Sequence, residues 1–143
     1  MSAYERIAPE LYAYICNTVS DTPFYNLIGI NLERIEKGHA VLSVWPKEDH
    51  LNPLGMVHGG LVVTLADAAM GNAIRSMGIK GVTADITVSF ISPPPLGVKI
   101  EAEGRVLKAG QNLIFAEAEV WAEKKLIAKS QGTFFKTGEI SLG

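Results

Sequence analysis

Cysteine, clustered positive charge and long hydrophobic runs are all scarce in this sequence, and each scarcity excludes a class of protein. Cys16 is the only cysteine among the 143 residues, so a disulfide within the chain and a cysteine-rich zinc site are both excluded. The 13 Lys and Arg residues are scattered and outnumbered by 15 Asp and Glu, whereas a nucleic-acid surface needs clustered basic residues. No apolar stretch reaches the ~20 residues that a membrane helix needs. We therefore expect a soluble, cytoplasmic protein with no nucleic-acid or membrane partner.

The composition is that of one globular domain. Hydrophobic residues make up 48% of the chain and charged residues 20%, which is enough apolar material for a core. The length suits a single domain over residues 1–143. An amphipathic pattern predicts a first helix over about residues 3–18.

Residues 61–77 form the clearest helical segment. Eleven of these 17 residues are apolar and surround most of the helix, which is typical of a helix buried on more than one side. Its many Ala and Gly positions let another backbone approach closely.

After this helix, apolar and polar residues alternate, as they do in strands with one wet face, whereas residues 40–45 before it carry apolar residues on both faces. Two strands are expected within residues 28–45, separated at Lys37-Gly38, and further strands over about residues 82–90, 98–106, 114–122 and 126–135. The order predicts an α+β fold in which an antiparallel sheet of about five or six strands wraps around one long helix. An open sheet edge and leftover apolar helix surface predict at least a dimer.

The loop before the long helix contains the first candidate site. Gly59-Gly60 open the helix, and none of the usual capping residues Ser, Thr, Asp or Asn stands at the boundary. A free N–H at a helix start can donate to a carbonyl oxygen that becomes negative during a reaction. Alternatively, the two glycines serve only a tight turn into the helix.

Three polar residues accompany these glycines. Asp67 lies two turns into the helix, beside its apolar residues. It either orients or deprotonates water, or it has no catalytic role and faces solvent. His58 and Asn52 either donate hydrogen bonds to a carbonyl or have structural roles in the loop.

Several common catalytic motifs are missing. The sequence contains no Gly-x-Ser-x-Gly elbow, no phosphate-binding loop and no dinucleotide fingerprint. The three histidines lack metal-ligand spacing. We expect no metal and no cofactor.

Together, Asn52, His58-Gly59-Gly60 and Asp67 resemble the signature of the hotdog-fold thioesterases of the phenylacetate-degradation type, the PaaI-like family. In that family an acidic residue follows the histidine by nine positions and an asparagine often precedes it by six, as here (67 − 58 = 9, 58 − 52 = 6). The resemblance covers roughly residues 25–137. It implies a hotdog fold and an acyl-CoA thioesterase that hydrolyses an aromatic or medium-chain acyl-CoA to the free acid and coenzyme A.

The resemblance also implies roles for the catalytic residues. The backbone N–H of Gly59 would polarise the thioester carbonyl, while Asn52 and His58 hold that carbonyl or order the loop. Asp67 of the facing subunit would act as base or nucleophile, and Thr83 would help to position water.

Substrate binding is less well defined by the resemblance. Gly60, Ser92, Lys108 and Gln111 are the candidates for contacts with the substrate. Lys108, Gln111 and the turn near Ser92 are the candidates for the phosphates of coenzyme A. Coenzyme A is part of the substrate and not a cofactor. The family also implies a homodimer, or a homotetramer made of two dimers.

Two other functions remain open at this point. Hotdog folds also include dehydratases and hydratases of acyl thioesters, whose catalytic histidine follows a different pattern. Other hotdog domains bind acyl-CoA without hydrolysis and act as sensors, usually with a DNA-binding segment attached.

Overall fold

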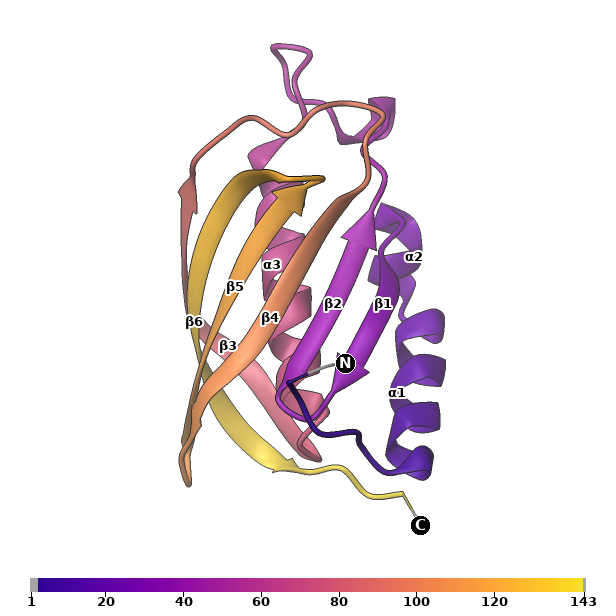
Figure 1. The fold of residues 1–143 in the computed structure, drawn as a ribbon, viewed down its shortest axis with the longest axis vertical. Helices are drawn as coiled ribbons and strands as arrows, with labels where there is room; N and C mark the ends of the chain where they lie inside the picture. Colours follow the sequence, from indigo (N-terminus) through magenta and orange to yellow (C-terminus); the bar gives the residue numbers. More distant parts are fainter. Residues whose placement is uncertain (1–2, 143) are drawn as a thin grey trace.

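In the computed structural model, which describes residues 3–142, the chain forms one six-stranded antiparallel sheet around a central helix (Figure 1). Met1, Ser2 and Gly143, the ends of the predicted domain, lie outside the described residues. The strands are β1 (Asn31–Glu36), β2 (His39–Val44), β3 (Ile79–Phe90), β4 (Ile100–Ala109), β5 (Leu113–Ala122) and β6 (Lys125–Glu139). Their order across the sheet is β1-β2-β4-β5-β6-β3, so β1 and β3 are the edges. This is the predicted hotdog architecture.

The helices are α1 (Pro9–Asp21), α2 (Pro23–Ile28) and α3 (Gly59–Arg75), with a short 3-10 turn η1 (Glu48–His50) before α3. The first helix begins at Pro9 and not near residue 3. Pro fits the first helical position because its missing N–H would have no partner there. Helices α1 and α2 extend the helical layer over β1, beside α3 (Figure 1).

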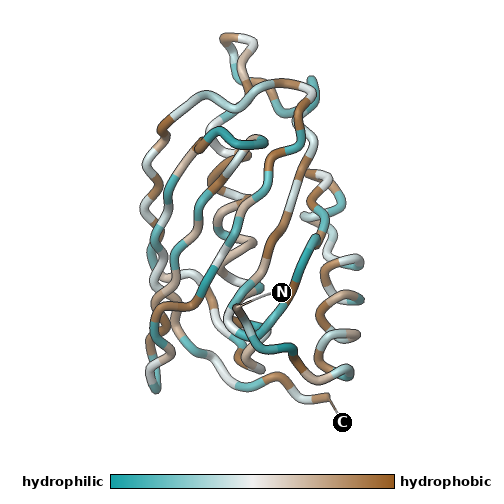
Figure 2. Tube along the Cα trace, in the orientation of Figure 1, coloured by the Kyte–Doolittle hydropathy of each residue, from teal (hydrophilic) through white to brown (hydrophobic). Residues whose placement is uncertain are grey.

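The core lies between α3 and the concave face of the sheet, where α3 packs against β2, β3, β4 and β5. Along β4 and β5, apolar and polar residues alternate as the sequence predicts (Figure 2). The buried residues of β5 are Ile114, Ala116, Ala118, Val120 and Ala122. Ten of the 17 residues of α3 are buried, in agreement with a helix that is covered on more than one side.

One glycine allows the closest approach of helix and sheet. A Cβ on Gly104 of β4 would lie 2.5 Å from the carbonyl carbon and oxygen of Ala69 and 2.7 Å from the nitrogen of Met70. The backbone of α3 therefore rests directly on β4.

Strand β3 departs from the one-wet-face pattern. Every residue from Ile79 to Phe90 is exposed or half-buried, although β3 pairs with β6 along one side. Its other side is an unpaired sheet edge within residues 3–142.

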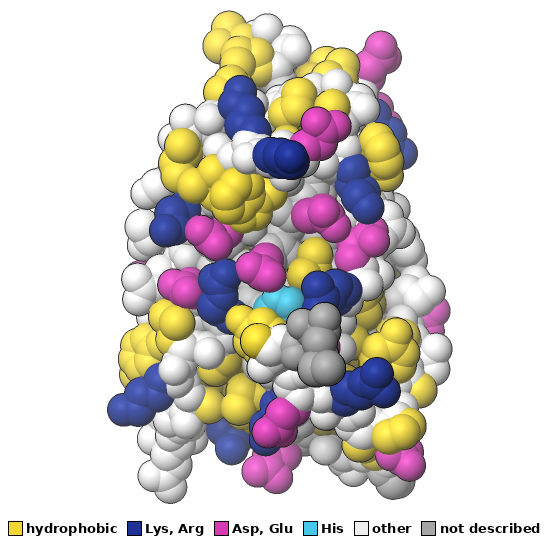
Figure 3. All heavy atoms as spheres, viewed as in Figure 1, with side chains coloured by type: hydrophobic (Ala, Val, Ile, Leu, Met, Phe, Trp, Pro, Cys, Tyr) yellow, Lys and Arg dark blue, Asp and Glu magenta, His cyan; other side chains and the backbone are white. Residues whose placement is uncertain are grey.

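The outer face of the sheet mixes charges of both signs among separate apolar patches (Figure 3). Arg105 contacts Glu103, Glu117 and Glu119 there, at 2.8 to 3.3 Å. In residues 3–142 no helix is long and apolar enough to cross a membrane.

Candidate active site

The start of α3 is capped by a residue that the sequence patterns did not identify as a cap. Nδ1 of His58 accepts a 2.8 Å hydrogen bond from the N–H of Gly60, and the carbonyl of His58 accepts one from Leu61. An N–H can only donate, so Nδ1 is unprotonated and the neutral ring has its proton on Nε2. The N–H of Gly59 donates to no group in residues 3–142. The helix start therefore has one free amide donor, with the Nε2–H of His58 in the same loop.

Asn52 orders the loop that precedes the helix. Its Oδ1 accepts hydrogen bonds from the N–H groups of Leu54 at 2.9 Å and Met56 at 3.0 Å. Its own N–H donates to the carbonyl of Met56 at 2.7 Å. Of the two predicted roles, the geometry of this side-chain oxygen fits loop ordering.

Asp67 and Thr83 come together although they are 16 positions apart. The hydroxyl of Thr83 donates a 2.6 Å hydrogen bond to Oδ1 of Asp67. Asp67 is half-buried on α3, and Thr83 is exposed on β3. A β-bulge between Thr83 and Asp85 increases the local twist of the strand at this point. A half-buried carboxylate with one oxygen bound can still act on water or on a carbonyl through the other.

A tyrosine from α2 approaches the same part of α3. The hydroxyl of Tyr25 accepts a 3.2 Å hydrogen bond from Nδ2 of the buried Asn72. Burial raises the pKa of Tyr25, the Asn72 hydrogen bond opposes that rise, and the negative charge of Asp67 adds to it. Tyr25 is therefore a neutral hydroxyl, and it lies close enough to Asp67 for the negative charge of that carboxylate to raise its pKa.

The free amide and the carboxylate are separated along the helix. Gly59 and Asp67 are eight positions apart on α3 (67 − 59 = 8), which corresponds to roughly 12 Å along the axis. Both groups would have to lie within about 3 Å of one reacting carbonyl group. One chain therefore does not place its own Gly59 N–H and Asp67 on the same thioester.

The predicted substrate-binding residues lie at two ends of the molecule. Near the helix start, a Cβ on Gly59 would be 3.3 Å from the ring of Phe90 at the end of β3, and Ser92 follows two residues later. Lys108 lies at the other end, where it shares a cavity with Met77 just after α3. Gln111 is exposed in the turn between β4 and β5 at that same end (Figure 1).

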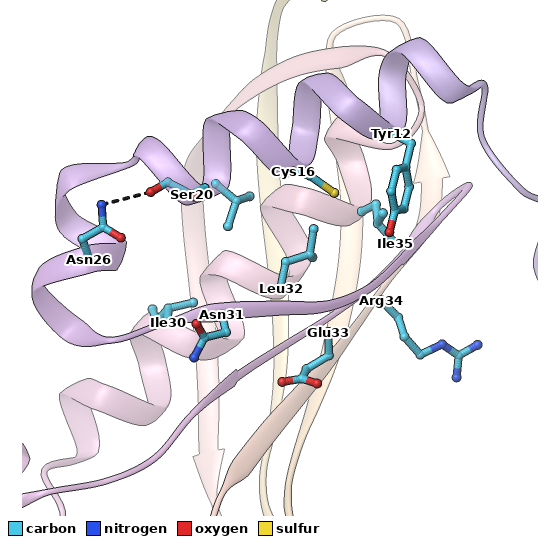
Figure 4. A pocket seen from close by; sticks show the side chains of 11 residues that line it. Tyr12, Cys16, Ser20, Asn26, Ile30, Asn31, Leu32, Glu33, Arg34 and Ile35 are labelled. Carbon is cyan, nitrogen blue, oxygen red and sulfur yellow. Dashed lines mark hydrogen bonds between the residues drawn. The ribbon is translucent and has the colours of Figure 1, made fainter.

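Two of the cavities beside the helices differ in their lining. One, of about 320 Å³, lies at the start of α3 and is lined by apolar and polar side chains together: Ile28, Asp49, His50, Leu51, His58, Gly60, Leu61 and Thr64. The other, of about 280 Å³, lies between α1 and β1, with Tyr12 and Cys16 in its wall (Figure 4). Of these two cavities, the first contains the predicted site residues His58 and Gly60, and the second contains none. Residues 3–142 include no cluster of three or more His, Cys, Asp or Glu that could hold a metal ion.

Sequence patterns did not identify Tyr25, Asn72 or His50 as neighbours of the site. Tyr25 lies 42 positions before Asp67 (67 − 25 = 42) in a six-residue helix, and nothing in the local pattern predicts which way that helix faces. Asn72 interrupts an apolar arc of α3, and a polar residue at such a position is a signal that a buried partner exists.

Comparison with known proteins identifies the family of the chain. The sequence profile of the thioesterase superfamily matches residues 54–129. Human acyl-coenzyme A thioesterase 13 is 33% identical over 115 residues, which cover 77% of this chain and 82% of the human protein.

Solved structures extend the comparison to the whole fold. The Escherichia coli PaaI protein from the phenylacetic acid degradation operon superimposes with a TM-score of 0.86, covering 94% of this chain and 99% of its own, at 23% identity. A Streptococcus mutans protein bound to acetyl CoA has a TM-score of 0.75 and 27% identity, covering 78% of this chain and 91% of its own.

Proposed function

Since the chain belongs to the thioesterase superfamily, as an acyl-CoA thioester hydrolase of the PaaI-like hotdog family, we propose that it releases an aromatic or medium-chain acid at a site shared by two copies of the chain. The observation that carries the proposal is that Asp67, which accepts a hydrogen bond from Thr83 of β3, lies on the same helix as the free Gly59 N–H but about two turns away from it. A second copy, with its helix running in the opposite direction, would bring its Asp67 to the first copy's Gly59.

The edge strand β3 supports this assembly. Its residues from Ile79 to Phe90 are exposed or half-buried, and no strand within residues 3–142 pairs with its outer edge. Exposed edges of this kind pair readily with another strand. The proposed assembly is a homodimer through β3, or a tetramer made of two such dimers.

In the proposed reaction, the thioester carbonyl accepts hydrogen bonds from the N–H of Gly59 and the Nε2–H of His58. Asp67 of the second copy either takes a proton from water, whose oxygen attacks the carbonyl carbon, or attacks that carbon itself. The tetrahedral oxyanion is stabilised by the same donors. The carbon–sulfur bond then breaks, and the thiolate of coenzyme A leaves and takes up a proton. If Asp67 attacks directly, water hydrolyses the resulting anhydride in a second step.

The other proposed contacts belong to the same shared site. Ser92 and Gly60 lie on the copy that supplies Gly59. Lys108 and Gln111 would reach the phosphates of coenzyme A from the second copy, since they lie at the other end of their own chain. The chemistry needs only side chains, backbone amides and water, so the proposal includes no metal and no cofactor. The single thiol, Cys16, suits the reducing cytoplasm, which we propose as the location.

The cavity at the start of α3 supports an apolar acyl group of moderate size. Its apolar walls come from Ile28, Leu51 and Leu61, and its volume is about 320 Å³. A cavity of roughly 150 Å³ already holds benzene, so an aryl or medium-chain acyl group fits.

A mixing experiment tests the shared site. Asp67→Asn and Gly59→Pro subunits are each expected to be inactive alone. The two variants are mixed, unfolded and refolded together, and the mixture is assayed with a panel of aromatic and aliphatic acyl-CoAs. Half of the dimers formed at random are mixed, and each has one intact site, so about a quarter of the wild-type thiol release is expected. Mixed dimers that form but stay inactive would place both groups in one chain and contradict the proposal.

A further inference from the structure

His50 lies almost fully buried, with 8% of its surface exposed, in the segment that leads to α3. Both of its ring nitrogens bind backbone groups. Nδ1 accepts a 3.0 Å hydrogen bond from the N–H of Lys47, and Nε2 lies 2.8 Å from the carbonyl oxygen of Ile28, the last residue of α2. An N–H only donates and a carbonyl only accepts, so the ring is the neutral form with its proton on Nε2.

The main chain of His50 connects this arrangement to the helix start. Its carbonyl accepts a 2.8 Å hydrogen bond from the N–H of His58, and the neighbouring residues Leu51 and Val57 form an isolated β-bridge. His58 in turn accepts from Gly60 through Nδ1. A continuous series of hydrogen bonds therefore runs from the end of α2 through His50 and His58 to the first turn of α3.

We propose that His50 is a positioning residue for the carbonyl-polarising donors. It fixes the loop to α2 so that His58 caps Gly60 in the Nε2–H form and leaves the N–H of Gly59 free. His50 is eight positions from His58 (58 − 50 = 8) and its ring nitrogens bind only backbone groups, so its effect is transmitted through His58. This inference rests on the proposed function for its activity measurement, and it has a second measurement that does not.

Two variants separate the contributions of ring packing and hydrogen bonding. His50→Phe fills a similar space but makes neither ring hydrogen bond. His50→Gln can still donate from its amide to the carbonyl of Ile28. Displacement of reacting groups by about 1 Å can cost ~100-fold in rate, so we expect kcat of the Phe variant to fall by roughly 10- to 100-fold, with KM changed less than about 3-fold. The Gln variant should recover part of that loss.

His39→Gln is the matched control. His39 is also buried, at 1% exposed, and also binds through both ring nitrogens, to Glu36 at 3.1 Å and Glu103 at 2.9 Å. These contacts involve β1 and the outer sheet face, away from the start of α3. Its loss should lower stability and leave kcat unchanged.

The second measurement is nitrogen NMR of histidine-labelled protein, which reports the tautomer of His58 without any substrate. We expect the Nε2–H form alone in the wild type and a mixture of both tautomers in His50→Phe. A Phe variant with wild-type kcat and an unchanged His58 tautomer would overturn the proposal, and if that variant does not fold, the Gln variant decides by the same two measurements. A wild-type protein that is inactive on every acyl-CoA while His58 shows the Nε2–H form would overturn the proposed function and leave the positioning role standing.

Discussion

The hydroxyl of Thr83 donates a 2.6 Å hydrogen bond to Oδ1 of Asp67, joining the exposed edge strand to the central helix. A hydroxyl donor occupies one oxygen of the carboxylate and fixes the plane of the group. Oδ2 is then the oxygen that can act on water or on a thioester. The pair thus defines both the position and the direction of the reacting carboxylate.

Removing the carboxylate should abolish most of the activity. Asp67→Asn keeps the shape of the side chain but cannot act as base or nucleophile, so we expect turnover to fall by at least about a hundredfold. Thiol release from acyl-CoA measures the rate, and sedimentation checks that the oligomer is unchanged. Near-normal turnover by an intact oligomer would rule out the assigned role of Asp67.

Removing only the hydroxyl should have a smaller effect. Thr83→Val has nearly the same shape but cannot donate to Asp67, and one lost hydrogen bond of about 1.4 kcal/mol corresponds to roughly a tenfold lower kcat. Thr133→Val, on β6, is the control and should leave kcat unchanged.

If Thr83 acts through Asp67, the double variant Asp67→Asn with Thr83→Val should be no slower than Asp67→Asn alone. Additive losses would show that Thr83 contributes in another way.

Much of the fold follows from local patterns, because β4 and β5 show the alternation of two faces and α3 has apolar residues around most of its circumference. The sequence therefore predicts the break at Lys37-Gly38, the long helix and the strands after it, all of which the structure confirms. The strand order does not follow from such patterns. Pairing of β3 with β6, and of β2 with β4, joins segments far apart in the chain, and local periodicity contains no information on partners.

The family signature predicts the residues of the site that belong to it, but not the contacts that those residues make with the rest of the chain. The spacing of Asn52, His58 and Asp67 indicates the helix start and the carboxylate. The resemblance predicts a role for Thr83 in positioning water, but the hydrogen bond from Thr83 to Asp67 and the bulge beside Thr83 in β3 follow neither from it nor from the alternation of residues. The hydrogen bonds of His50 to Ile28 and Lys47 depend on where α2 ends in space, and no local rule gives that position.

The free amide of Gly59 can be tested with a proline, whose ring carbon takes the place of the amide hydrogen. Proline suits the first position of a helix, and His58 has φ −66° and ψ 135°, an extended conformation compatible with a following proline. Gly59→Pro should therefore fold and lower kcat by about 10²- to 10³-fold, the usual cost of one lost oxyanion donor.

Gly59→Ala is the control for this prediction. It adds the same Cβ, which would meet the exposed ring of Phe90 at 3.3 Å, but it keeps the N–H. The alanine variant should therefore keep far more activity than the proline variant. Equal losses in the two would show that the Cβ, and not the missing hydrogen, causes the effect.

Glu103 on the outer sheet face should stabilise the fold in a pH-dependent way. Burial alone would raise the pKa of Glu103, but hydrogen bonds from His39 and Arg105 outweigh it and lower the pKa from its ordinary 4.5. A folded-state pKa below the unfolded value contributes stability that is complete above pH 4.5 and is lost as pH falls through the folded value.

Glu103→Gln should therefore be less stable than wild type at neutral pH, and the difference should shrink in acid. Urea unfolding across that range measures it, with exposed Glu10→Gln as the control. A difference that is constant with pH would contradict the charge-based origin.

The close contact of α3 with β4 leaves no room for one methyl group, and that contact holds the helix that carries Asp67. Gly104→Ala would place its Cβ 2.5 Å from the backbone of Ala69. Backbone atoms of a buried helix cannot rotate away as a side chain can, so helix and sheet must separate. We expect a loss of about 2–3 kcal/mol in the free energy of unfolding, and lower activity because α3 shifts relative to Thr83.

Gly138→Ala, at the end of β6, is the control, since no atom in the described part of the chain lies within 4 Å of its Cβ position. Equal stability of the two variants in denaturant unfolding would mean that α3 does not rest on β4 at Gly104.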